Sequence, residues 1–314
     1  MRKILITGGA GFIASSLAEK LIEDKNNSVV IVDNLLTGKI GKLPKKNNDK
    51  WKFIKCNVNN KSDISQVMMS YKFDYIFHYA AMVGVKYTLD HPIKVLEDIE
   101  GFKNILELSK NTGVKRIYFS SSSEIYGEPV EYPQNEETTP LNSRLPYAIV
   151  KNIGEAFLKA YNREFHLDYT IFRFFNTYGS KQSSNFVISK FLTQALGNDN
   201  ITVYGDGTQT RTFCYIDDNV DACLNAFYNN KFINDVVNIG VDIPISMSEL
   251  AKLIIKITNS KSKIIYLPPL DEGDMSGRKP DITKMKTITQ NNPISLEEGI
   301  KKILKIGLYE MNKT

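Results

Sequence analysis

The sequence has few of the residues that form cross-links or hold metals. Its 314 residues include three cysteines and three histidines. Cys56, Cys214 and Cys223 are odd in number and lack a C-x-x-C spacing, which excludes a disulfide framework and is typical of a reducing compartment. The histidines do not form a ligand-like pair, so we expect no metal site.

Long apolar runs and a strong charge of one sign are also missing. No apolar run approaches the length of a membrane span, and residues 1–6 run directly into a predicted strand without a signal peptide. We therefore expect a cytoplasmic protein. The 40 Lys and Arg exceed the 35 Asp and Glu by only +5, spread along the chain, which argues against nucleic-acid binding and suits an anionic small substrate. One small basic cluster, Lys42, Lys45 and Lys46, is interpreted as a solvated loop.

The first half of the chain alternates short apolar runs with longer amphipathic stretches. This pattern predicts an α/β fold with a doubly wound parallel sheet and crossover helices. Beyond Asn176 the pattern loosens into Ser, Asn, Gly and Thr, which indicates a smaller, partly irregular α/β C-terminal lobe. We expect the larger lobe to comprise 1–175, with 212–241 returning to it, and the smaller lobe to comprise 176–211 and 242–314. The predicted strands are 4–7, 29–33, 53–56, 75–78, 116–120 and 169–174, and the predicted helices include 12–23, 63–71, 92–110 and 146–166.

A glycine-rich turn joins the first strand to the first helix. Gly8 allows the tight turn, and Gly11 lets the backbone approach a pyrophosphate at the helix N-terminus, where Phe12 and Ile13 begin the helix. Asp33 closes the second strand about 20 residues further on, as ribose recognition requires. This context favours dinucleotide binding over an ordinary strand-to-helix connection. Because Asp33 would accept a hydrogen bond from a ribose hydroxyl and repel a 2′-phosphate, we expect NAD and not NADP.

A serine-rich segment and a Tyr/Lys pair carry the reactive groups. Ser122 and Glu124 lie in the segment SSSSEIYG, and Tyr147 and Lys151 lie four residues apart on one helix face. An ammonium beside a phenol lowers the pKa of the phenol, and a phenolate can take a proton from an alcohol. With an oxidised nicotinamide as hydride acceptor, these groups predict an enzyme that oxidises a sugar hydroxyl. A surface Tyr/Lys pair without a catalytic role is the alternative.

Taken in this order, the motifs resemble those of the extended short-chain dehydrogenase/reductase family, in its branch of nucleotide-sugar epimerases, dehydratases and decarboxylases. The resemblance covers nearly the whole chain and implies a Rossmann-type sheet. Two positions depart from the pattern: Ala14 stands where the family usually has a third Gly, and Asn57 where it often has Asp for the adenine amine. Other matching segments are HYAA at 78–81, RFFN at 173–176, VYGDG at 203–207, QTR at 209–211 and RKPD at 278–281.

The resemblance implies a role for each matched residue. Tyr147 is expected to be the base, Lys151 to hold the nicotinamide ribose and Ser122 to bind the reacting oxygen. The larger lobe then binds NAD and the smaller lobe binds a nucleotide-diphosphate sugar. The implied NAD-binding residues are Gly8, Gly11, Phe12, Ile13, Asp33, Asn34, Asn57, Val58, Ala80, Ala81, Ser120, Tyr147, Lys151 and Phe174. The implied substrate-binding residues are Lys86, Ser122, Ser123, Asn176, Val203, Tyr204, Arg211 and Arg278.

Glu124 bears on the fate of the oxidised sugar. Simple 4-epimerases of the family tend to carry a small or neutral residue here, whereas 4,6-dehydratases and glucuronate decarboxylases have Glu for acid/base work on a 4-keto intermediate. Ser123 before it resembles the decarboxylases and GDP-mannose dehydratases. Arg278 matches the decarboxylase Arg assigned to the substrate carboxylate, but the short loop 179–185 lacks their additional basic residues.

Several functions therefore stay open at this point. We expect NAD-dependent oxidation at C4 of a nucleotide-linked sugar, followed by dehydration or decarboxylation. The alternatives are a 4-dehydrogenase that releases the 4-keto product, a 4-epimerase, and a non-catalytic NAD-sensing module that the retained Tyr147 and Lys151 disfavour. Glu124 itself has a structural alternative, in which it only caps the following loop.

The resemblance also bears on partners. The amphipathic stretches 92–110 and 147–166 match helices that pair as a four-helix bundle in dimeric relatives, so we expect a homodimer or higher homo-oligomer. No nucleic acid or membrane partner is expected, and the family implies a role in polysaccharide biosynthesis. The nucleotide base and the sugar are not indicated by the sequence.

Overall fold

The computed structural model describes residues 1–314 except 46–48, 270–274, 290 and 309–314. The chain forms two compact units, here called unit 1 and unit 2. Unit 1 comprises Met1–Ile125, Ser143–Arg173 and Cys223–Val237, and unit 2 comprises Tyr126–Asn142, Phe174–Ala222 and Asn238–Thr314. Within the described residues, no helix has the length and apolar character needed to cross a membrane.

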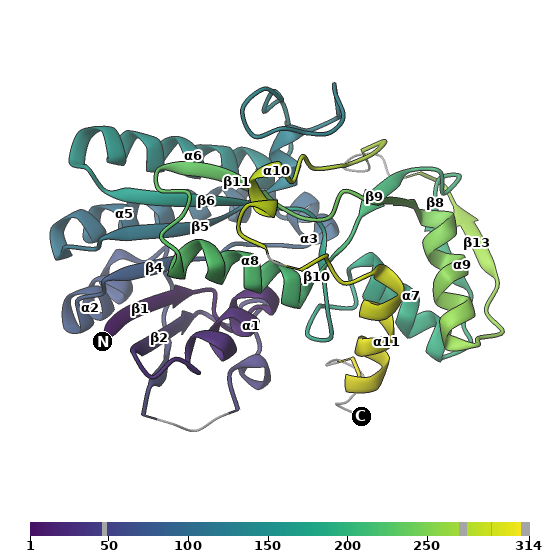
Figure 1. The fold of residues 1–314 in the computed structure, drawn as a ribbon, viewed down its shortest axis with the longest axis horizontal. Coiled ribbons are helices and arrows are strands. Elements are labelled where there is room, and N and C mark those ends of the chain that lie inside the picture. The colour runs from purple at the N-terminus through teal and green to yellow at the C-terminus, as the bar shows by residue number, and fades with distance from the viewer. Residues whose placement is uncertain (46–48, 270–274, 290, 309–314) are drawn as a thin grey trace. The chain divides into compact units, whose positions relative to one another are not determined.

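A seven-stranded sheet forms the centre of unit 1 (Figure 1). Its strand order is β11-β6-β5-β4-β1-β2-β3, and the pairs of β1 with β2 and β4, of β2 with β3 and of β4 with β5 are parallel. The order reverses at β1, which is the switch point where doubly wound sheets bind ligands at the strand carboxyl ends. The strands are β1 (Arg2–Thr7), β2 (Asn27–Asp33), β3 (Trp51–Lys55), β4 (Tyr75–His78), β5 (Arg116–Ser122), β6 (Asp168–Phe174) and β11 (Asp235–Ile239).

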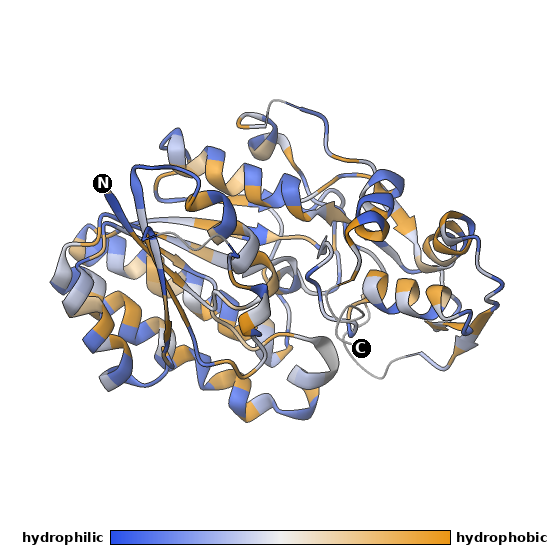
Figure 2. Ribbon diagram, turned by 90° about the horizontal axis from the view of Figure 1, so that it is seen from below, coloured by the Kyte–Doolittle hydropathy of each residue, from blue (hydrophilic) through white to orange (hydrophobic). Residues whose placement is uncertain are grey.

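Alternating side chains of the strands pack on opposite faces of this sheet. On β5, Phe119 joins a buried cluster with Phe102 of α5, whereas Tyr118 packs edge-on against Phe227 of α8. Figure 2 shows the apolar residues concentrated on the strands and in stripes along the helices. This alternation gives each face of the sheet its own helical layer. The helices of unit 1 are α1 (Phe12–Leu21), α2 (Lys61–Tyr71), α3 (Val85–Asp90), α4 (Pro92–Leu96), α5 (Asp98–Thr112) and α6 (Pro146–Phe165), with the C-terminal part of α8 (Ile216–Tyr228).

The close approach of α6 to the sheet depends on one glycine. A Cβ added to Gly154 would lie 2.5 Å from Phe102 and 3.0 Å from Phe119, so a larger residue would push α6 away from both α5 and β5. Since α6 begins at Pro146, the first position where a missing N–H costs nothing, its start is fixed as well.

The helix predicted over 92–110 is interrupted and forms α4 and α5. The Asp98 carboxylate accepts hydrogen bonds from Met82 N (2.7 Å) and Asn59 Nδ2 (3.1 Å), two groups far from it in sequence. These contacts hold the Asp98 side chain at the position where the second helix begins. The predicted C-terminal end at Gly113 is confirmed, because Gly113 has φ 79° in the left-handed region.

Unit 2 combines short strand pairs with helices. β7 (Thr177–Tyr178) pairs with β10 (Cys214–Tyr215), β9 (Thr210–Thr212) with β12 (Pro244–Ser246), and β8 (Ile201–Tyr204) with β13 (Ile264–Leu267). Its helices are α7 (Val187–Leu196), α9 (Met247–Thr258), α10 (Thr283–Lys286) and α11 (Leu296–Ile306), with the N-terminal part of α8. This is the small α/β lobe with short, interrupted elements that the sequence predicts.

Candidate active site

The glycine-rich turn forms a cradle at the carboxyl end of β1. Gly8 has φ +66°, and a Cβ there would lie 2.6 Å from Ala80 Cα, so only glycine lets the turn touch the segment after β4. Gly11 N donates to Gly8 O (2.9 Å), and no side-chain cap from the described residues covers the N-terminus of α1. The first N–H groups of α1, from Phe12 and Ile13 onward, therefore match an anionic pyrophosphate. Ala14 is buried and accommodated in the helix.

Thr7, directly before Gly8, ties β1 to β4. Its hydroxyl accepts hydrogen bonds from Tyr79 N and Ala80 N, both at 3.1 Å, and lies 2.8 Å from His78 Nδ1. A hydroxyl has two acceptor lone pairs and one proton, so the proton is donated to His78. His78 Nδ1 is therefore an acceptor, and the imidazole is neutral.

Burial and, to a smaller extent, the nearby Lys151 charge lower the pKa of His78 to about 3. In the unfolded chain His78 takes up a proton below about pH 6.5. Between these values only the unfolded chain binds the proton, so the contribution of His78 to stability is intact above pH 6.5 and falls as the pH drops towards 3.

We expect His78→Asn to remove this acid sensitivity. Asn can still accept the Thr7 hydrogen bond but does not titrate, so the difference in unfolding free energy between wild type and variant should change by about 3–5 kcal/mol across this range. Urea unfolding from pH 7 to pH 4 measures the rising part of this difference. The control is His166→Asn, an exposed residue whose left-handed φ of 57° suits Asn. Parallel pH curves for wild type and His78→Asn would contradict the assignment of a neutral imidazole.

Asp33 presents a carboxylate at the end of β2. Its Oδ2 accepts from Ala10 N (3.0 Å) and its Oδ1 from Leu35 N (2.7 Å), and burial raises its pKa. Two N–H bonds leave acceptor capacity on both oxygens for ribose hydroxyls. The neighbouring Asn34 is exposed, and its Oδ1 accepts from Leu36 N.

One sequence interpretation about this region is wrong. Lys42 was placed in a solvated loop, but its exposed fraction is only 4%. The loop after β2 folds back onto the glycine-rich turn, where Lys39 N donates to Ala10 O (3.0 Å), and Lys42 is buried within it, whereas Lys45 is exposed. Lys46 lies outside the described residues.

Other predicted NAD-binding residues follow the strands nearest the switch point. Asn57 Oδ1 accepts from Asn59 N (3.2 Å), and Val58 beside it is buried. Ala80 and Ala81 follow β4 and are half-buried, with Ala80 against the Gly8 turn. Phe174, the last residue of β6, is half-buried and belongs to unit 2.

Lys151 connects α6 to the end of β5. Its Nζ donates to Ser120 O (2.6 Å) and lies 3.4 Å from Ser120 Oγ and 5.7 Å from the centre of the Tyr147 ring. Lys151 is 2% exposed, and burial lowers its pKa to about 8 although the Asp98 charge acts in the opposite direction. The structure thus brings Ser120, Tyr147 and Lys151 together at one strand end. The ammonium is held next to the phenol ring, as the proposed chemistry requires.

Ser122 and Glu124 stand at the junction of β5 and the short helix η2 (Ser123–Tyr126). Ser122 Oγ accepts from Glu124 N at 3.2 Å, which does not use the hydroxyl proton. That proton can be donated to a substrate oxygen. Glu124 is half-buried and Ser123 is buried. The bond fixes the backbone of Glu124 relative to the Ser122 hydroxyl.

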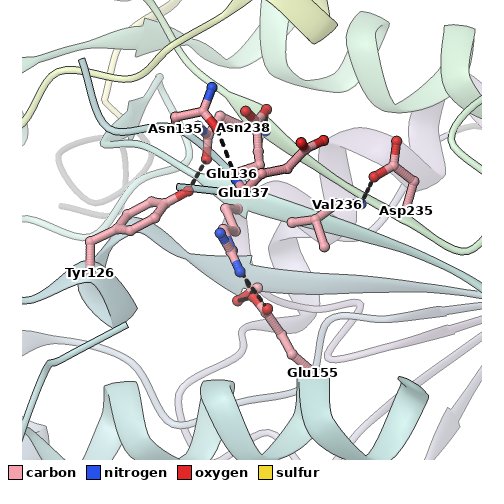
Figure 3. A network of polar contacts seen from close by, with 10 residues as sticks. Tyr126, Asn135, Glu136, Glu137, Glu155, Asp235, Val236 and Asn238 are labelled. Carbon is pink, nitrogen blue, oxygen red and sulfur yellow. Dashed lines mark hydrogen bonds and ion pairs between the residues drawn. The ribbon is translucent and has the colours of Figure 1, made fainter. Parts of the chain in front are cut away.

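A buried ion pair joins α6 to β6 within unit 1. Glu155 accepts from Ser121 Oγ (2.6 Å), Arg173 Nε (3.0 Å) and Arg173 Nη2 (2.7 Å), and the side chains of Glu155 and Arg173 are 1% and 2% exposed. Figure 3 shows the Glu155 carboxylate in this contact. The sequence interpretation missed Glu155. Its position four residues after Lys151, on the same face of α6, was the available signal.

The predicted substrate-binding residues of unit 2 lie on several of its segments. Asn176 Nδ2 donates to Thr212 O (3.3 Å), and Arg211 Nη1 donates to Thr210 O (2.8 Å). Thr210 N donates a hydrogen bond to Ser276 O (3.1 Å), so the segment before Arg211 lies beside the segment before Arg278. The Arg278 side chain is buried. On β8, Val203 is in the core and Tyr204 is 37% exposed. The predicted residue Lys86 is in α3, and its side chain is not among the side chains that the structure describes.

Unit 2 also contains a polar network of its own. Tyr126 Oη donates to Asn238 Oδ1 (2.8 Å), and Asn238 N donates to Glu136 Oε1 (2.8 Å), as Figure 3 shows. These bonds join the segment after η2 to the end of β11. Among the described residues, no group of three His, Cys, Asp or Glu side chains forms a possible metal site.

The comparisons with known proteins all indicate the same family. Residues 4–240 match the model of the NAD dependent epimerase/dehydratase family. The chain is 35% identical over 319 residues to the UDP-N-acetyl-alpha-D-glucosaminuronate decarboxylase of Bacillus cytotoxicus, covering 97% of each chain. It is 33% identical to the UDP-glucose 4-epimerase of Thermotoga maritima, solved with UDP-glucose (99% and 100% coverage, TM-score 0.91). It is 29% identical to the UDP-glucuronic acid 4-epimerase of Bacillus cereus, solved with UDP-glucuronic acid and NAD (97% and 100% coverage, TM-score 0.88).

Proposed function

The chain belongs to the NAD dependent epimerase/dehydratase family, and we propose that its substrate is a UDP-linked hexuronic acid that loses its carboxyl group. Membership of this family makes it an NAD-dependent enzyme that oxidises C4 of a nucleotide-linked sugar. Three features fit NAD: the cradle of Gly8 and Gly11, the start of α1, which no side chain of the described residues caps, and the Asp33 carboxylate. When bound, NAD would accept the hydride from C4.

The observation that carries the proposal is the Ser122–Glu124 hydrogen bond. It fixes the backbone of Glu124, an acid/base residue, next to the hydroxyl that is expected to hold the reacting oxygen. An epimerase needs only to remove and return the C4 hydrogen, whereas a carboxylate at this position suits a second proton transfer at a neighbouring carbon. The similarity to a uronate decarboxylase over 97% of the chain supports the same choice.

The residues would then act in two stages. In the first, the Tyr147 phenolate takes the proton of the C4 hydroxyl while Ser122 donates a hydrogen bond to that oxygen. The Lys151 ammonium beside the ring favours the phenolate. Together these groups let C4 become a ketone as its hydride leaves.

In the second stage the 4-keto sugar is a β-keto acid, because the carboxylate is attached to C5 next to the ketone. The bond from C5 to the carboxylate breaks, carbon dioxide leaves, and its electron pair passes into an enolate over C4 and C5. Glu124 in its acid form then protonates C5. The 4-ketone would finally take back a hydride at C4 and a proton from Tyr147 on its oxygen, so that the net change is the loss of carbon dioxide. The buried guanidinium of Arg278 is proposed to bind the substrate carboxylate or diphosphate before this step.

The direct test is incubation of the protein with NAD and UDP-glucuronic or UDP-N-acetylglucosaminuronic acid, followed by mass spectrometry. Loss of carbon dioxide from either sugar is expected. If both keep their mass and a stereoisomer appears, the enzyme is an epimerase and the proposal is wrong. If neither hexuronate reacts while a neutral UDP-sugar does, the proposed substrate class is wrong.

A 4-epimerase is the second candidate, and a specific observation favours it. The loop 179–185 contains only one basic residue, Lys181, so it adds little charge for a uronate. The similarity to the Thermotoga maritima 4-epimerase spans 99% of the chain.

Glu124→Gln separates the two candidates. For a decarboxylase we expect formation of the 4-keto sugar at a rate near that of wild type, while the later protonation slows by about 10²–10⁴-fold, because Gln cannot donate a proton to carbon. Rapid-quench mass spectrometry would follow both steps, with Glu164→Gln on the exposed end of α6 as the control. Wild-type product formation by Glu124→Gln would leave Glu124 as a structural residue only.

Further assignments belong to the same proposal. We propose that residues 1–175 with 212–241 bind NAD and that 176–211 with 242–314 bind the UDP-sugar, through the residues assigned to each from the sequence. A cytoplasmic homodimer that acts in polysaccharide biosynthesis is consistent with these roles. Size-exclusion chromatography with light scattering would test the dimer.

A further inference from the structure

Asn238 is a buried residue near the carboxyl end of β11, and its side chain joins three segments of unit 2. Its exposed fraction is 0%. Its Nδ2 donates to Gln134 O (2.9 Å) and to Asp281 O (3.2 Å), and its Oδ1 accepts from Tyr126 Oη (2.8 Å), a bond that Figure 3 shows. Because both N–H groups face carbonyl oxygens, the orientation of the amide is fixed.

The two carbonyl groups belong to a short parallel pairing of two loop segments. Gln134 N donates to Lys279 O (2.7 Å), and Asp281 N donates to Gln134 O (2.8 Å), which forms a bridge between Gln134 and Pro280. A carbonyl oxygen has two lone pairs, so Gln134 O accepts from Asp281 N and Asn238 Nδ2 together. Asn238 therefore adds one hydrogen bond to each side of this bridge.

The same bridge carries Arg278, to which the proposed function gives an anionic group of the substrate. Arg278 lies two residues before Pro280 and is 2% exposed. A Cβ on Gly240 would lie 3.1 Å from Pro280 Cγ and 2.9 Å from Phe175 Cβ, so this segment is packed closely against the residues after β11. A guanidinium binds an anion in a fixed fork geometry, which makes binding sensitive to where the backbone of Arg278 is held.

We propose that Asn238 is a positioning residue for Arg278. It acts through the bridge between Gln134 and Pro280 and does not touch the substrate itself. The inference rests on the role of Arg278 in the proposed function and adds the residue that sets its place. It also explains the choice of side chain, because Asp at this position would direct an oxygen at two carbonyl oxygens and an apolar residue would remove the donor to both.

Calorimetric titration of the NADH-loaded protein with UDP-glucuronic acid tests the proposal, because the reduced cofactor cannot accept a hydride and the sugar stays intact. Asn238→Ala should weaken binding at least about tenfold, the contribution of one hydrogen bond to a charged group. The dissociation constant of NADH should stay within about threefold of wild type. The matched control is Asn219→Ala, a buried asparagine of unit 2 whose Nδ2 donates to Thr177 Oγ1 (3.0 Å).

A double-mutant cycle with Arg278 separates positioning from a general loss of stability. If Asn238 acts through Arg278, Asn238→Ala should change the affinity by less than about twofold in the Arg278→Met background. Additive effects of the two substitutions would overturn the proposal, as would binding of wild-type strength by Asn238→Ala. Urea unfolding gives the stability of each variant, and Asn238→Ser, which retains a hydrogen-bond donor, covers the case in which Asn238→Ala does not fold.

UDP-glucose, which lacks the carboxylate, shows which anionic group is involved. A loss of affinity for UDP-glucuronic acid alone assigns the carboxylate to Arg278, an equal loss for both ligands assigns the diphosphate, and either result supports the positioning role. If the wild-type protein bound UDP-glucose but not UDP-glucuronic acid, the proposed substrate would fail. The same cycle with UDP-glucose would then still decide the role of Asn238.

Discussion

Tyr147→Phe is expected to slow oxidation at C4 by about 10²–10⁴-fold, the usual contribution of a positioned acid/base group. The ring stays in place at one turn from Lys151, but the oxygen that takes the proton is lost. Because the proposed NAD contacts lie mainly on the glycine-rich turn and on Asp33, the NAD dissociation constant should stay within about threefold of wild type, which corresponds to less than about 1 kcal/mol. Single-turnover absorbance of NADH and a separate NAD titration measure the two quantities.

The matched control for this prediction is Tyr161→Phe. Tyr161 lies on the same helix α6, is half-buried and loses the same hydroxyl. It should retain normal oxidation. Normal turnover by Tyr147→Phe would refute its role as the base, whereas loss of NAD binding would indicate a structural defect and call for Tyr147→His as a second substitution that retains an acid/base group.

Arg173→Met should destabilise unit 1 by about 3–5 kcal/mol, because it leaves the Glu155 carboxylate buried without its cation. Among the described residues, Glu155 would keep the hydrogen bond from Ser121 alone, at a site that is 1% exposed. The double variant Arg173→Met/Glu155→Met removes both charges and should recover most of this loss. Urea unfolding, monitored by circular dichroism, provides the three unfolding free energies.

The ion pair of Lys301 with Glu297 is the control for the effect of exposure. These side chains are 61% and 49% exposed, four residues apart on α11, and Lys301→Met should change stability by less than about 0.5 kcal/mol. If Arg173→Met had an equally small effect, the pair of Arg173 and Glu155 would not hold α6 to the sheet. Equal losses in the single and double variants would instead show that packing and not charge accounts for the effect.

The local patterns of the sequence were sufficient to predict the fold and to indicate candidate reactive groups. The turn at Gly8 and Gly11 and the spacing to Asp33 are features of one strand–helix–strand segment, so neighbours in sequence fix them. The spacing of Tyr147 and Lys151 needs only a helix. These predictions depend on the periods of helix and strand, which a single sequence displays directly.

The partners of the buried polar groups could be decided only by the tertiary structure. Thr7 meets His78 across 71 residues, and Lys151 meets Ser120 across 31. The contacts of Asp98 with Met82 and Asn59 and the burial of Lys42 likewise involve segments distant in sequence or a loop that folds back. A local sequence pattern does not identify such partners, because a polar side chain can form its hydrogen bonds with water unless packing excludes that water. The sequence by itself therefore determined which chemistry is present, and the folding of distant segments against each other decided which groups are neutral, charged or held in place.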